Sequence, residues 1–160
     1  MAGCLGCGEG GNVSPDSVRR WTEKLSNMLL SSTARRKFHD YLESRDLEQG
    51  QSLLEFWEKC DSFLDQAESH SQEWSPEGKA RSNTMKQEAQ LITEFADSNI
   101  NFDPAQMQAL YAAVESGDKQ TVMTAISEAK KSAAEMLEEE GYQEFCRYLL
   151  RGQGMLKDKC

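Results

Sequence analysis

The sequence predicts an all-α protein, and three observations support this class. Apolar residues recur at steps of three and four along most of the chain, as expected for helices with one buried face. The sequence shows neither the alternation of strands nor an internal repeat period. Only three prolines interrupt 160 residues, of which 38% are hydrophobic and 28% charged. A chain of this length can bury one core without disulfides or metals, so we expect a single domain with tails.

The tails are predicted from composition. Residues 1–16 contain five of the eleven glycines and no aromatic residue, which is typical of a flexible segment. We therefore expect a flexible tail over 1–16, a folded domain over 17–150 and a C-terminal tail over 151–160.

The first helix is expected to begin after Ser17 as its N-cap and to end near residues 31–32, and Thr33 is expected to cap the second. A third follows Gly50, a loop covers 68–76, and a fourth runs to about Phe95. The apolar faces of the first three helices consist of Trp21, Leu25, Met28 and Leu29, then Phe38, Tyr41 and Leu42, then Leu53, Leu54, Phe56, Trp57, Cys60, Phe63 and Leu64.

The later helices are marked by helix-start and helix-stop residues. Asp103 and Pro104 predict a start, Gly117 a stop, and Gly141 a break before a short last helix. The apolar positions here are Met107, Leu110, Tyr111 and Val114, then Val122, Ile126, Ala129, Ala133, Met136 and Leu137, then Tyr142, Phe145, Leu149 and Leu150.

The charge of the chain restricts its partners. A formal charge of −9 and a pI near 4.8 argue against nucleic acid, since phosphate binding needs a basic surface. No apolar run approaches the roughly 20 residues that span a bilayer, and the N-terminus lacks the features of a secretory signal. We therefore expect a cytoplasmic protein. We also expect it to act as a monomer.

Five cysteines, an odd number, indicate free thiols in a reducing compartment, with Cys60 and Cys146 buried on helices. Cys4 and Cys7 have the spacing of a metal or redox pair, but no second pair lies nearby and the two histidines stand alone, so no metal is expected. Exposed tail thiols are one interpretation of this pair, and palmitoylation is another. Myristoylation is excluded because Ala2 follows Met1.

Two acidic segments are interpreted as ordinary surface. Residues 97–103 place side-chain oxygens at alternate positions, but Phe102 stands where a calcium loop needs glycine, and Gln108 where it needs glutamate. The run Glu138, Glu139 and Glu140 is expected to be solvated, although acids at a helix C-terminus oppose the helix dipole.

The chain has one basic concentration, which is either a solvated face or a surface for anionic membranes. It consists of Arg19, Arg20, Arg35, Arg36 and Lys37. Phosphate-binding loops and nucleophile motifs do not occur, so we expect neither a cofactor nor an active site of the protein's own.

Several segments occur in an order that resembles the regulator of G-protein signalling (RGS) domain, and the resemblance covers about residues 17–150. The segments are Val18-Arg19-Arg20-Trp21, Leu54-Glu55-Phe56-Trp57-Glu58-Lys59-Cys60, Glu94-Phe95, Ile100-Asn101-Phe102-Asp103, Ile126-Ser127-Glu128-Ala129 and Glu140-Gly141-Tyr142-Gln143-Glu144-Phe145.

The resemblance implies a two-lobed bundle of about nine helices that grips the switch regions of an activated Gα subunit. Asn101 matches the family's asparagine that reaches toward the Gα catalytic glutamine. The family's Glu-Asn pair is replaced by Ser52 and Leu53. In its later acid-Ser-Tyr-x-Arg pattern, the acid is Glu140, whereas Gly141 replaces serine and Glu144 replaces arginine, an exchange that can turn attraction into repulsion.

The leading hypothesis is therefore a GTPase-activating protein that attenuates G-protein signalling. One alternative keeps the fold as a binding or scaffold module without GTPase-activating activity. Another is a membrane-tethered adaptor, peripheral at the plasma membrane, that acts through Cys4, Cys7 and the basic helices.

Overall fold

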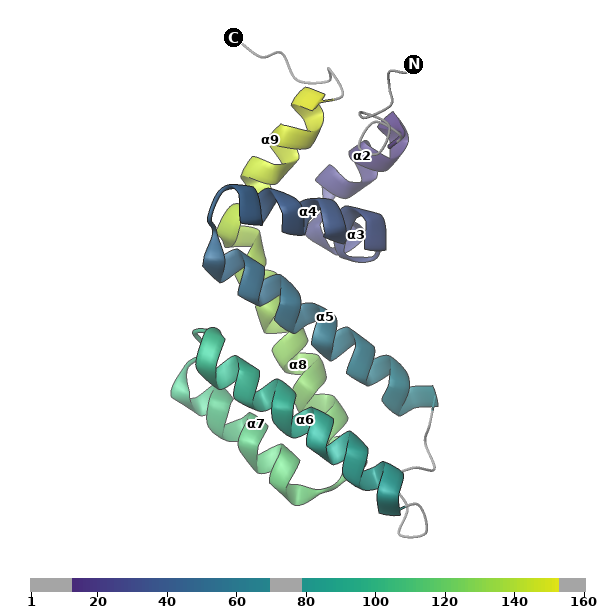
Figure 1. The fold of residues 1–160 in the computed structure, drawn as a ribbon, viewed down its shortest axis with the longest axis vertical. Coiled ribbons are helices and arrows are strands. Elements are labelled where there is room, and N and C mark those ends of the chain that lie inside the picture. The colour runs from purple at the N-terminus through teal and green to yellow at the C-terminus, as the bar shows by residue number, and fades with distance from the viewer. Residues whose placement is uncertain (1–12, 70–78, 153–160) are drawn as a thin grey trace. The chain divides into compact units, whose positions relative to one another are not determined.

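The computed structural model describes residues 13–69 and 79–152, and every regular element in these ranges is helical, which confirms the all-α prediction there (Figure 1). The chain forms two compact units. Unit 1 comprises the described residues up to Arg45 and those from Gly141 onward, and unit 2 runs from Asp46 to Glu140. The elements in chain order are α2 (Pro15–Glu23), α3 (Leu25–Leu29), α4 (Ser32–Ser44), α5 (Glu48–Ser69), α6 (Lys79–Asn99), α7 (Pro104–Ser116), α8 (Lys119–Leu137), the π-helical turn η3 (Glu138–Tyr142) and α9 (Gln143–Gly152).

The first helix begins earlier than the sequence predicted. Ser14, not Ser17, is the N-cap of α2, and its Oγ accepts a hydrogen bond from the Ser17 backbone N–H at 3.1 Å. Pro15 then occupies the first helical position, where the missing N–H costs nothing. Ser31 likewise replaces Thr33 as the cap of α4, with its Oγ 3.1 Å from the Ala34 nitrogen. In both places a second hydroxyl residue lies two or three positions upstream of the expected cap.

The single helix expected over 17–31 is interrupted at Lys24, whose backbone is extended. Side chains bind the carbonyl groups at the two new helix ends. Asn27 Nδ2 donates to the Arg20 carbonyl at 3.1 Å, and Arg35 Nη1 donates to the Leu29 carbonyl at 2.7 Å. Carbonyl groups in the last turn of a helix lack partners within that helix. The Asn27 bond therefore stabilises the end of α2 before the break, and the Arg35 bond stabilises the end of α3.

The other boundaries differ from the predictions mainly by one turn or less. α5 begins at Glu48 rather than after Gly50 and continues through Ser69, so the loop starts later than predicted. His70 and Trp74 lie outside the described residues. α6 continues past Phe95 to Asn99.

The two ends of α7 agree with the sequence prediction. Asp103 and Gln106 form a reciprocal capping box, and Gly117 ends α7 in the left-handed conformation at φ 68°. Asp118 then caps α8 by accepting hydrogen bonds from the N–H and Oγ1 of Thr121, which lower the pKa of the Asp118 carboxyl.

Unit 1 is held together by an aromatic cluster contributed by α4, η3 and α9. Phe38 and Phe145 are fully buried, with ring centroids 4.8 Å apart. Tyr41 packs on Phe145 at 5.4 Å, and the Tyr142 hydroxyl donates to the Trp21 carbonyl at 2.6 Å in the interior. This last bond joins α2 to the segment that precedes α9, so residues 121 positions apart in the sequence share one buried contact.

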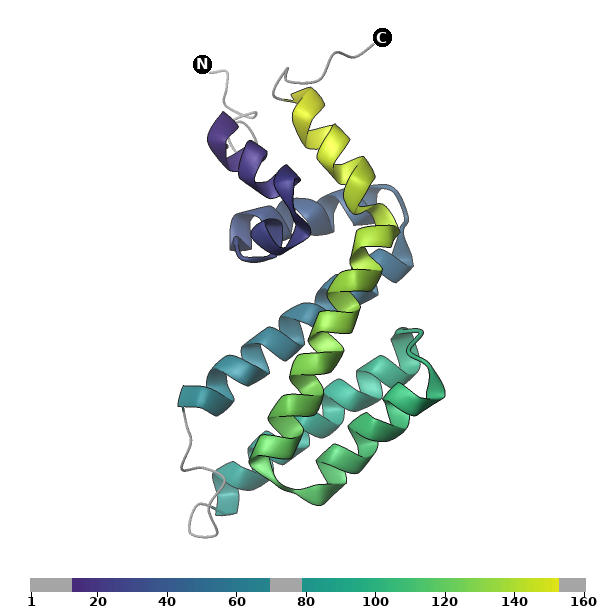
Figure 2. The ribbon, with the colours of Figure 1, turned by 180° about the vertical axis from the view of Figure 1, so that it is seen from behind.

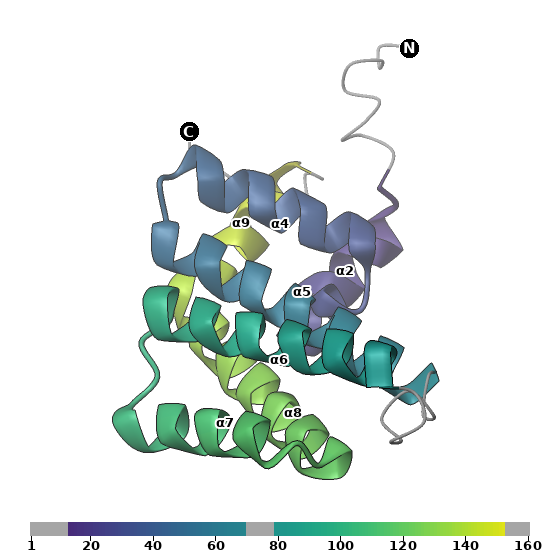
Figure 3. The same ribbon diagram turned by 60° about the horizontal axis from the view of Figure 1, so that its bottom comes forward.

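Unit 2 consists of α5, α6, α7 and α8. Each helix packs on the next one in the chain, and α5 also packs on α8. Figure 3 shows α6 between α5 and α7, and Figure 2 shows α8 crossing α5 on the side turned away in Figure 1. Lys130 of α8 fixes this crossing, because its Nζ lies 2.9 Å from Asp61 Oδ1 and 4.9 Å from the centre of the Trp57 ring. This half-buried ion pair links α5 to α8.

The predicted burial of Cys60 and Cys146 is confirmed, and both thiols are free. Burial raises the pKa of the Cys60 thiol well above its ordinary value. Since the thiolate is the reactive form, we expect Cys60 in the native protein to react with iodoacetamide at least about tenfold more slowly than in guanidinium chloride. Peptide mass spectrometry of labelled samples measures this ratio at Cys60 itself. Equal labelling rates in the two conditions would contradict the buried position.

Candidate functional site

Four helix ends gather at one end of unit 2, because each helix runs antiparallel to its packed neighbours (Figure 1). These are the start of α5, the end of α6, the start of α7 and the end of α8. Ser52 lies in the second turn of α5, Asn101 in the connection between α6 and α7, and Glu140 in η3 directly after α8. We call these three residues the contact end. Three of the expected contact positions, distant in sequence, are therefore placed at the same end of one unit.

Asn101 is presented by the short connection between α6 and α7, in which burial alternates. Ile100 is 5% exposed and Phe102 is 9% exposed, whereas Asn101 between them is exposed. The Phe102 ring meets Phe56 of α5 edge to face, with centroids 5.5 Å apart. Asp103 follows directly as the N-cap of α7. The Asn101 side chain thus projects from a backbone that is anchored on both sides.

Other side chains around this connection are engaged in local hydrogen bonds. Tyr111 of α7 donates its hydroxyl to Asp97 Oδ2 at 2.8 Å, which raises the pKa of Tyr111, and Asn99 Nδ2 donates to the Phe95 carbonyl at 3.1 Å. Asp97 thus links α6 to α7, Asn99 binds a carbonyl in the last turn of α6, and Asp103 caps α7.

Ser52 and Leu53 differ in accessibility. Ser52 is half-buried, and it lies one helical turn before Phe56 on α5. Leu53 is 0% exposed. A partner can therefore reach Ser52, but it cannot reach the side chain of Leu53 in this arrangement.

A family model described as the Regulator of G protein signaling domain matches residues 24–150. The chain belongs to the RGS family. RGS proteins regulate G-protein signalling and are GTPase activators rather than enzymes with an active site of their own. No curated protein and no solved structure matched in the corresponding comparisons. Among the described helices, none is both long enough and apolar enough to cross a membrane.

The remaining RGS contact candidates lie in η3 and in the first turn of α9. Glu140, the last residue of unit 2, is half-buried. Gly141 and Glu144 belong to unit 1, where Gly141 is buried and Glu144 is exposed in the first turn of α9. A carboxylate in a first turn interacts favourably with the helix dipole, so Glu144 has a local stabilising role besides any contact role.

Gly141 has a backbone reason to be glycine in this RGS domain. Its φ is 111°, a conformation that residues with a Cβ rarely adopt. The RGS pattern usually has serine at this position. In this chain the backbone conformation of Gly141 disfavours serine, because serine has a Cβ.

The basic concentration of the RGS domain is partly engaged within unit 1. Arg19 forms an ion pair with Asp16 at 2.8 Å, and Arg35 binds the Leu29 carbonyl as described above. Arg20 and Arg36 are exposed, and Lys37 is half-buried. Cys4 and Cys7, the thiols proposed for acylation, lie outside the described residues.

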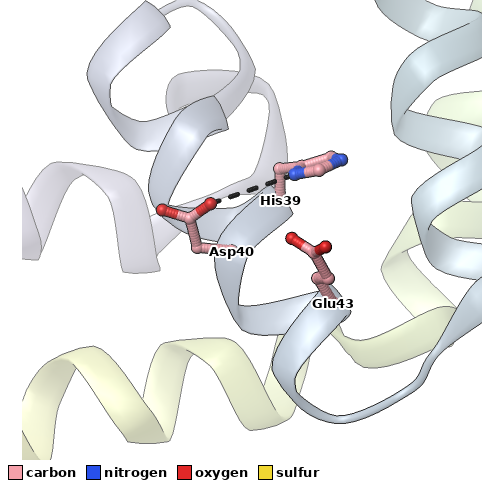
Figure 4. Close-up of side chains that lie close together, drawn as sticks. All are labelled: His39, Asp40 and Glu43. Carbon is pink, nitrogen blue, oxygen red and sulfur yellow. Dashed lines mark ion pairs between the residues drawn. The ribbon is translucent and has the colours of Figure 1, made fainter.

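His39 is not isolated, as the sequence had suggested, because two carboxylates lie close to it. His39, Asp40 and Glu43 gather on one turn of α4, with His39 Nδ1 4.0 Å from Asp40 Oδ1 (Figure 4). Their potential ligand atoms lie within 4.8 Å of one another. All three come from one solvent-facing turn of a single helix, and exposed acidic groups of this kind are common in proteins without a bound ion.

The left-handed conformation of Gly141 predicts the effect of restoring the usual serine. We expect Gly141→Ser to lower the free energy of unfolding by about 1–2 kcal/mol, since a Cβ is strained at this φ. Urea unfolding followed by circular dichroism measures the change. Gly152→Ser is the matched control, because a Cβ at Gly152 meets nothing within 4 Å. Equal stability of the two variants would contradict the strain argument.

Proposed function

We propose that this RGS domain binds an activated Gα subunit and accelerates its GTP hydrolysis by stabilising the switch regions, thereby attenuating G-protein signalling. The observation that carries the proposal is the exposed Asn101, held between the buried Ile100 and Phe102 at the position matching the family's asparagine. The family match over residues 24–150 supports the same conclusion.

The proposed mechanism needs no nucleophile or metal from this chain. A Gα subunit carries its transition-state arginine in cis, so its hydrolysis is limited by how well its mobile switch loops hold the attacking water. A rigid amide that meets these loops in the transition-state arrangement favours that arrangement over the others. Ser52 and Glu140, at the same end of unit 2, are proposed to complete the contact.

A second candidate is an RGS-fold binding or scaffold module that lacks GTPase-activating activity. It is favoured by the departures from the family pattern, since the Leu53 side chain is buried, Gly141 offers no hydroxyl, and Glu144 presents a carboxylate where the family has arginine. Loss of these polar contacts weakens binding without altering the fold.

The proposal includes further expectations from the sequence. The domain is proposed to have the two-lobed arrangement of about nine helices and to act as a cytoplasmic monomer without a cofactor. Peripheral association with the plasma membrane is proposed to follow if Cys4 and Cys7 are acylated, as in the adaptor alternative.

Removing the Asn101 amide tests the leading proposal. We expect the protein to accelerate single-turnover GTP hydrolysis by at least one member of a Gα panel, and Asn101→Ala to reduce that acceleration about tenfold or more, as for a central interface residue. Asn99→Ala is the matched control, because Asn99 is exposed two positions away and bonds its own helix. Binding to Gα with GDP and aluminium fluoride, without acceleration of any Gα, would support the scaffold candidate instead.

Restoring the family's cation provides an independent test. We expect Glu144→Arg to increase affinity for Gα or the rate of activated hydrolysis several-fold, because a repulsive charge becomes attractive. The same change is expected to cost about 0.3–1 kcal/mol of stability through the helix dipole. Parallel affinity and unfolding measurements separate the two effects. Glu139→Arg, at another exposed acid of the same segment, is the control, and an equal gain from it would argue for general charge instead of a specific contact.

A further inference from the structure

An open groove of about 740 Å³ lies between α5 and α6, and the described residues that line it come only from these two helices. Its lining includes neither Ser52 nor Asn101, although it reaches Glu55 on α5 and Asn99 on α6. On α6 the lining extends from Glu88 to Asn99, which at 1.5 Å per residue is about 16 Å, or roughly three helical turns. Figure 1 views α5 and α6 from the side opposite α8. The groove is therefore long and open rather than a closed cavity.

The floor of the groove is apolar. Phe63 and Ile92 are buried, Phe95 is half-buried, and Leu91 is 63% exposed. An isolated exposed leucine is ordinary on a protein surface. Here the exposed leucine adjoins two aromatic rings within a concave surface, which is the arrangement expected of a binding groove.

The rim of the groove is acidic. Glu55, Glu58, Glu88 and Glu94 line it together with a single lysine, Lys59, which gives a formal net charge of −3.

Lys59 is held within the rim, since its Nζ lies 3.7 Å from Glu55 Oε2 and 5.3 Å from the centre of the Phe95 ring. Glu94 accepts a hydrogen bond from the neutral amide of Gln90 at 3.0 Å, which leaves its charge in place. The residues that line the groove therefore carry a formal excess of negative charge.

We propose that this groove docks a cationic amphipathic helix of a partner protein other than Gα. The apolar face of such a helix would cover Leu91 and the floor, while lysine or arginine side chains along its edges would meet the glutamates of the rim. Two neighbouring antiparallel helices present a groove into which a third helix packs. The acidic rim repels anionic lipid headgroups and nucleic acid, so neither is the favoured occupant.

The test uses a fluorescein-labelled synthetic peptide of about 14 residues, with leucines at positions i, i+3, i+4 and i+7 and lysines along both edges. We expect saturable binding to the full chain by fluorescence anisotropy, weakened by added salt. Leu91→Ala is expected to weaken binding about tenfold, and Glu94→Lys about threefold or more.

Matched controls separate the groove from general surface effects. Leu30→Ala removes another leucine, 80% exposed and in unit 1, and Glu128→Lys reverses another exposed glutamate of unit 2 that does not line the groove. Both are expected to leave peptide binding unchanged, and circular dichroism checks the fold of all four variants.

Three results would overturn the proposal: no saturable binding, equal binding of a scrambled or glutamate-substituted peptide, or equal losses in the groove and control variants. Gα is absent from this assay, so its outcome is independent of whether the protein accelerates GTP hydrolysis.

Discussion

The ring of Phe56 is the constraint on which the presentation of Asn101 depends. This fully buried side chain of α5 lies parallel to Phe95 of α6 and meets Phe102 of the following connection edge to face. Aromatic pairs of this kind add about 0.5–1.5 kcal/mol each beyond the burial of their area. One side chain thereby fixes two helices and the loop between α6 and α7 relative to one another.

A second constraint acts in unit 1, where the Tyr142 hydroxyl binds the Trp21 carbonyl in the interior. Removing either partner of a buried hydrogen bond leaves the other unsatisfied, at a cost of about 1–3 kcal/mol. The bond holds Tyr142 in place, and the neighbouring residue Gly141 has φ 111° within η3. Gly141, which replaces the family's serine, therefore has a role in the backbone turn that precedes α9, besides any effect on partner choice.

The helical periods and caps made much of the fold predictable from the sequence. Apolar spacing identified the core faces, and Asp103 and Gly117 marked the ends of α7 because their side-chain and backbone requirements are local. The caps at Ser14 and Ser31 were missed because neighbouring hydroxyl residues satisfy the same local rule, and packing decides between them. The break at Lys24 leaves no signal in apolar spacing, since Trp21 and Leu25 remain four residues apart.

The candidate site was less predictable, because accessibility is a property of the packed structure. Order along the chain predicted Asn101 as a contact residue, but it did not show that Leu53 is interior or that Gly141 has a positive φ. The α5–α6 groove requires the two helices to be packed. Its one signal in the sequence is Leu91, an apolar residue between Glu88 and Glu94 and adjacent to the buried Ile92.

The alternating burial of Ile100, Asn101 and Phe102 has a thermodynamic consequence for recognition. Fixing the backbone of one residue costs about 1–2 kcal/mol in conformational entropy, and here the folding of unit 2 has already restricted the segment before any partner arrives. Under the proposed function, the association of Asn101 with a mobile Gα loop therefore requires ordering mainly in that loop. Such a preorganised residue favours one conformation of its partner over others, which is how a protein without reactive groups can change the rate of a reaction catalysed by another.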